Sequence, residues 1–71
     1  MVVNISVAVD AIRDNIESRT ARRIRNLEVE FGRDCIILRG RTHSFHVKQL
    51  AQHEVRKILK DVRIENAILV D

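Results

Sequence analysis

The fold is decided by residues 36–70, which read IILRGRTHSFHVKQLAQHEVRKILKDVRIENAILV. At both ends of this stretch an apolar or small residue stands at almost every second position, from Ile36 to Gly40 and from Val62 to Val70. Between them the apolar residues recur at every third or fourth position, which is the period of a helix. This change of period and its reversal predict a strand, a crossover helix and a second strand.

The first half of the chain predicts a helix and then a strand. Its apolar residues share one helical face: Ile5, Val9, Ile12 and Ile16. We expect Asn4 or Ser6 to cap this helix, which should end near Arg19 and be followed by a loop over residues 20–23. Residues 27–31 alternate apolar and acidic side chains and predict a strand.

A hairpin turn is predicted at residues 32–34, which are Gly, Arg and Asp. If Phe31 faces Ile36, the same register puts apolar residues together and opposite charges together: Val29 with Leu38, and Glu28 with Arg39. A slip of one residue would turn the apolar face outward, so the pattern supports this register.

The predicted order is therefore α-β-β-α-β in a single domain over residues 1–71, an α+β fold with two helices packed on one face of a three-stranded mixed sheet. A right-handed crossover places the last strand parallel to the second, and the alternative is an antiparallel position beside the first. A chain of this size buries only about 60% of its unfolded surface, so a deep active-site cleft is not expected.

The pairing separates an inner from an outer sheet face. The residues expected to face the helices are Ile36, Leu38, Ile64, Ile68 and Val70. The second helix, with Thr42 or Ser44 as its cap, is expected to turn these residues to the sheet: Val47, Leu50, Ala51, Val55, Ile58, Leu59 and Val62. Ile37, Ala67 and Leu69 are candidates for a docking face on the outer side, with Ile37 and Leu69 as a small exposed apolar patch.

Basic residues are unevenly distributed in a chain whose net charge is +3. Four arginines lie within seven residues that contain no acid: Arg19, Arg22, Arg23 and Arg25. Together with Lys57 and Lys60, if the fold brings them near, they are candidates for attracting an anionic surface such as phospholipid headgroups. Nucleic acid is an unlikely partner, because the outer sheet positions carry no aromatic side chain on which bases would stack.

The sequence contains no catalytic motif. His46 and His53 would lie about 10 Å apart along a helix, too far to share a metal ion, and His43 with His46 lacks a further ligand nearby. Cys35 is the single cysteine and has no partner for a disulfide within the chain. We therefore expect no catalytic residue, no metal, no cofactor and no small-molecule substrate.

The strand, helix and strand pattern carries a family resemblance at these residues: Ile36, Leu38, Gly40, Ser44, Lys48, Ala51, Val62, Ile64, Asn66, Ile68 and Val70. With them the chain resembles the BON domain family over about residues 8–70. BON domains are α-β-β-α-β modules, mostly of bacterial envelope, stress-response and channel proteins, and are generally proposed to bind phospholipid or to mediate attachment at membranes.

The resemblance implies two structural landmarks. Gly40 matches a family glycine at the end of the second strand, where the missing side chain is expected to let the chain turn tightly into the helix. Asn66 is the second landmark. Thr42 departs from the family pattern, which commonly has an apolar residue there, and so does the Lys60-Asp61 pair, where a glycine-containing turn is usual.

We thus expect a noncatalytic binding module that associates peripherally with phospholipid or anionic membrane surfaces, or attaches to a partner protein. The alternatives are a homo-oligomerisation or scaffolding domain without lipid affinity, and a KH-like nucleic-acid module, although the GXXG clamp of that class is absent. The resemblance suggests the cell envelope or periplasm, whereas the first residues do not read as a signal peptide.

Overall fold

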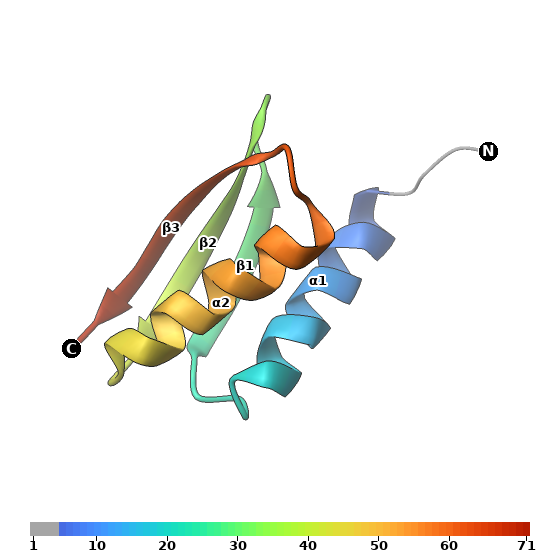
Figure 1. Cartoon of the computed structure of the whole chain (residues 1–71). Coiled ribbons are helices and arrows are strands. Elements are labelled where there is room, and N and C mark those ends of the chain that lie inside the picture. Colours follow the sequence, from blue (N-terminus) through green and yellow to red (C-terminus); the bar gives the residue numbers. More distant parts are fainter. Residues whose placement is uncertain (1–4) are drawn as a thin grey trace.

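The computed structural model describes residues 5–71, with side chains from residue 8 onward. Its elements follow the predicted order, α-β-β-α-β (Figure 1). They are α1 (Ile5–Arg19), β1 (Arg25–Phe31), β2 (Cys35–Thr42), α2 (Phe45–Ile58) and β3 (Arg63–Val70). The chain therefore has the predicted α+β fold.

The sheet is mixed and has the strand order β1-β2-β3. β1 and β2 pair antiparallel, and the predicted register is confirmed: Phe31 lies opposite Ile36, Val29 opposite Leu38, and Glu28 opposite Arg39. β3 runs parallel to β2 through eight consecutive pairs, from Cys35 with Arg63 to Thr42 with Val70. The crossover therefore follows the right-handed solution, and the alternative beside β1 is wrong.

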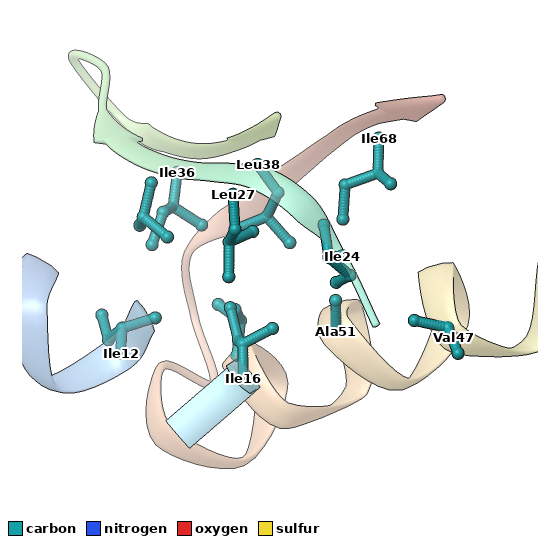
Figure 2. Packing of buried hydrophobic residues seen from close by; sticks show 11 residues of the cluster. Ile12, Ile16, Ile24, Leu27, Ile36, Leu38, Val47, Ala51 and Ile68 are labelled. Carbon is teal, nitrogen blue, oxygen red and sulfur yellow. The ribbon is translucent and has the colours of Figure 1, made fainter. Parts of the chain in front are cut away.

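Both helices cover the same face of the sheet, and the apolar core fills the space between the two layers (Figure 2). Within the described part of the chain the buried apolar side chains are Ile12, Ile16, Ile24, Leu27, Val29, Ile36, Leu38, Val47, Ala51, Val55 and Ile68. No helix of residues 5–71 lies on the other face, so these residues cover the sheet on one side only.

Two residues expected in the core are instead partly exposed to solvent. Val70 is the last residue of β3, and Ile58 is the last residue of α2. Each lies at the end of its element. Its place in the hydrophobic period puts it on the inner face, but the facing layer does not extend far enough to cover it. Periodicity thus identified the inner face correctly but overestimated its length.

The start of α1 at Ile5 places Ser6 inside the helix, so Ser6 is not its N-cap. Asn4, the other candidate, lies outside the described residues. The helix ends at Arg19 and a turn follows over residues 20–22, as predicted. Thr20 is buried there, and its hydroxyl donates a 2.7 Å hydrogen bond to the Ile16 carbonyl, which satisfies the polar group.

Gly40 is explained by a β-bulge in β1 and not by a turn. It lies within β2, two residues before the end of the strand, so the role expected from the family resemblance is wrong. The register shift between Arg25 and Glu28 puts two residues of β1, Asn26 and Leu27, against this one residue of β2. A Cβ at Gly40 would lie 2.7 Å from Ile24 Cγ2 and 3.0 Å from the Arg25 carbonyl oxygen, and its φ is +154°.

Replacing Gly40 by alanine should therefore lower the free energy of unfolding by about 1–3 kcal/mol, because the added methyl group overpacks the contact with β1. Urea denaturation of Gly40→Ala measures the loss. Gly32→Ala is the matched control: its one close contact would be the rotatable Cys35 Sγ at 2.7 Å, and the next atom lies 3.6 Å away, so a smaller effect is expected there. Equal losses in the two variants would contradict a role for the bulge.

Candidate functional site

A shallow hollow lined by three arginines lies at the end of the sheet where α2 begins. It has a volume of about 270 Å³ and is lined by two connections, residues 22–25 after α1 and residues 42–44 before α2. The lining residues are Arg22, Arg23, Arg25, Thr42, His43 and Ser44. We call this the basic hollow.

The turn at the end of α1 brings the arginines that follow this helix to the basic hollow. The Arg22 amide donates to the Glu17 carbonyl at 2.8 Å, and the Ala21 amide donates to the Ser18 carbonyl at 3.4 Å. These two bonds form a Schellman motif, in which the residue after the cap takes the left-handed conformation. Ala21 and Arg22 both do so, with φ of 54° and 57°. The chain thereby reverses at once, and Arg22, Arg23 and Arg25 follow within a few residues.

Glycine is the preferred residue at the position of Ala21, because an L side chain in the left-handed region costs about 1–2 kcal/mol. Ala21→Gly should therefore raise the free energy of unfolding by about 1 kcal/mol, as measured by chemical denaturation. Ala11→Gly, at an exposed position inside α1, should have the opposite sign and lower stability by about 1 kcal/mol. If Ala21→Gly lowered stability as Ala11→Gly does, the backbone at Ala21 would not be strained.

The other side of the hollow is the N-terminus of α2. Ser44 is the N-cap, and its Oγ accepts a 3.3 Å hydrogen bond from the Val47 amide. Of the two predicted caps Ser44 is thus confirmed, whereas Thr42 is buried and its Oγ1 accepts from the Ser44 amide at 3.4 Å. The partial positive charge of a helix N-terminus adds to that of the arginines.

Acidic residues balance only part of this charge. The Asp71 carboxylate lies 3.4 Å from the Arg25 guanidinium and 3.0 Å from His43 Nδ1. Glu17 lies 3.9 Å from the Arg22 guanidinium. Because these side chains are exposed to solvent, Glu17 in part and the others more fully, such pairs are weak and exchange readily with other anions. Arg23 forms no ion pair with any described residue.

The remaining basic candidates do not join the hollow. Arg19 of α1 binds the largely buried Glu54 carboxylate of α2 at 3.3 Å and so connects the two helices. Lys57 binds the same carboxylate at 3.6 Å within α2. Lys60 lies beyond the C-terminus of α2, a helix of 14 residues, so about 20 Å of helix separates it from the hollow. The six candidates from the sequence therefore divide, and Arg22, Arg23 and Arg25 remain together.

The apolar patch expected from Ile37 and Leu69 does not form. Ile37 pairs with Glu65, and Leu69 pairs with Arg41, four residues further along β2. The two side chains are thus about 13 Å apart along the strands. Ile37 is half-buried between the flanking acidic residues of β1 and β3. Ala67 and Leu69 do lie together, in a shallow hollow bordered by Arg39 and Arg41.

Arg39, on the outer face of the sheet, forms an ion pair with Glu30. Its guanidinium lies 2.6 Å from the Glu30 carboxylate. The hydrogen bond and the charge of Glu30 raise the pKa of the Arg39 guanidinium above its usual range, with smaller contributions from Glu28 and Glu65. Negative side chains on both edge strands therefore surround Arg39, and this part of the face carries no excess of positive charge.

Asn66, the second landmark, fastens α2 to the edge strand β3. Its Nδ2 donates to the Lys48 carbonyl at 2.9 Å and to Gln52 Oε1 at 3.3 Å, and its Oδ1 accepts from the Ile68 amide at 3.3 Å. The Asp71 amide donates to Thr42 of β2. Because the amides of successive residues in a strand point to opposite sides, the Ile68 amide, three residues earlier, points to the free edge of the sheet. The Asn66 side chain thus accepts a hydrogen bond from an edge amide, that of Ile68, which could otherwise pair with a strand of another chain.

Asn66→Ala should lower the free energy of unfolding by about 1–3 kcal/mol, because it leaves the Ile68 amide without its side-chain acceptor and removes the bond to Lys48. Gln52→Ala, which removes only one exposed partner of Asn66, should change stability by less than about 0.5 kcal/mol. Thermal denaturation of both variants tests this difference. A neutral Asn66→Ala would show that the three hydrogen bonds do not hold the helix.

Neither a metal centre nor a membrane span is found in the described residues. No group of three or more His, Cys, Asp or Glu side chains among residues 8–71 is arranged to hold a metal ion. No helix in residues 5–71 is long and apolar enough to cross a bilayer.

Sequence reasoning had identified the arginines but not their neighbours. The sequence indicates His43 only as a possible metal ligand, and Thr42 and Ser44 as possible caps and as positions compared with the family pattern; nothing in it points to Asp71. One feature of the sequence could indicate these neighbours: residues 42–44 connect the second strand to the helix, at the end of the sheet where the first strand begins. Comparison with protein-family models, with curated proteins and with solved structures finds no match for this chain.

Proposed function

We propose that this chain is a noncatalytic, BON-like module that attaches peripherally to anionic phospholipid surfaces. The observation that carries the proposal is the basic hollow, in which Arg22, Arg23 and Arg25 meet the N-terminus of α2. Phosphate groups suit this arrangement, because guanidinium groups bind phosphate oxygens in pairs of hydrogen bonds and helix N-termini favour negative charge.

The energetics favour a surface over a small enclosed ligand. The arginines are mainly exposed, with exposed side-chain fractions of 84% for Arg22 and 59% for Arg25. An exposed basic residue near an anionic leaflet contributes about 1 kcal/mol, and several act together within a Debye length of about 8 Å. A shallow hollow lets many headgroups approach, whereas it excludes little water from any one of them.

Cosedimentation with liposomes tests the proposal. Arg22→Gln, Arg23→Gln and Arg25→Gln combined should weaken binding to vesicles that contain phosphatidylglycerol by about 100-fold, from about 1 kcal/mol for each charge removed. Binding of the wild-type chain should fall steeply as salt increases, because salt screens exposed charges.

A matched control removes three positive charges elsewhere. Arg33→Gln, Lys57→Gln and Lys60→Gln combined lower the net charge equally but leave the basic hollow intact. This variant should bind more tightly than the hollow variant at equal salt. Equal losses would show that only the net charge matters, and equal binding to neutral and anionic vesicles, or none to either, would overturn the proposal. Thermal denaturation should show that both variants remain folded.

A further inference from the structure

Large apolar side chains are exposed beside the basic hollow. Phe45, at 60%, and Leu69, at 57%, are the two most exposed large apolar residues of the described chain, and Val70 beside them is exposed at 41%. Phe45 is the first residue of α2, directly after Ser44 of the hollow, and Leu69 and Val70 end β3. We propose that Phe45, Leu69 and Val70 are apolar anchors that insert into the lipid interface, so that the domain attaches by this end.

The pairing of the strands fixes the anchors next to the basic residues. Val70 lies opposite Thr42, a lining residue of the hollow, and Leu69 lies opposite Arg41. The Asp71 amide donates to the Thr42 carbonyl at 3.0 Å, which holds the end of β3 against this connection. Figure 1 shows the C-terminus and the start of α2 together at one end of the molecule. We call this the basic end.

Peripheral lipid binding needs such a combination of charge and apolar surface. Arginines attract the anionic headgroups, and neighbouring apolar side chains enter the boundary between headgroups and acyl chains. The long arginine side chains can extend to the phosphates while their stems cover apolar surface. The inference rests on the proposed function and adds to it the orientation of the domain and the residues that enter the bilayer.

The charge around Phe31 argues against attachment to an anionic surface through that residue. Phe31 and Ile58 are the other exposed large apolar residues, at the hairpin and at the C-terminus of α2. Around Phe31 the hairpin hollow contains Asp34 and Asp61 and only one arginine, Arg33. The immediate surroundings of Phe31 are therefore acidic on balance, although Lys60 and Arg63 lie at the same end of the molecule. The two phenylalanines of the chain thus form a matched pair of probes.

The experiment uses the absence of tryptophan from the sequence. Phe45→Trp and Phe31→Trp each introduce a single fluorescent reporter, and both are mixed with phosphatidylglycerol vesicles. The emission of Phe45→Trp should shift to the blue, because its indole leaves water, whereas that of Phe31→Trp should not change. A shift at position 31, or no shift at position 45 while the variant cosediments, would overturn the inference.

Phe45→Ser gives a second readout. It should weaken vesicle binding about tenfold at a salt concentration that screens the arginines, since burial of one phenylalanine contributes at least that much, and Phe31→Ser should leave binding unchanged. If the wild-type chain binds anionic vesicles but Phe45→Ser binds equally well, the anchors are wrong and the basic hollow remains. If the wild-type chain does not bind at all, both proposals fail.

Discussion

The contact between β1 and the bare backbone of Gly40 governs the rest of the structure. It lets the bulge at Asn26 and Leu27 form, with Ile24 packed where a side chain of β2 would otherwise stand. Because β1 approaches so closely, the loop that precedes it lies against the connection from β2 to α2. The arginines of that loop therefore face the start of a helix, and the basic hollow follows from a packing constraint in the sheet.

A second constraint acts at the other side of the sheet, where β3 has a free edge. Asn66 bonds both to the backbone of α2 and to the Ile68 amide of its own strand, so one side chain joins the helix layer to the sheet and covers part of the edge. An edge covered in this way does not recruit other strands. The two landmark residues thus serve packing, whereas the proposed binding rests on other, charged residues.

The distribution of charge gives the molecule two different ends. At the basic end three arginines exceed the nearby carboxylates, and the three apolar residues there stand exposed. At the hairpin end acids and bases are mixed. On the outer sheet face Arg39 is bound by Glu30. A difference of this kind between the two ends favours one orientation of a small domain at a charged surface, because the ends are attracted unequally.

The sequence by itself determined the order of the elements, the antiparallel register of β1 and β2 and the inner face of the sheet, because these depend on local hydrophobic period and on turn residues. Only the tertiary structure decided that Arg22, Arg23 and Arg25 meet His43, that Lys60 lies far from them, and that Ile37 and Leu69 are apart. Those relations depend on strand register and on a bulge, which join residues distant in the chain. Hydrophobic period specifies which side of an element is buried, but neither how far its neighbours extend nor which loops they bring together.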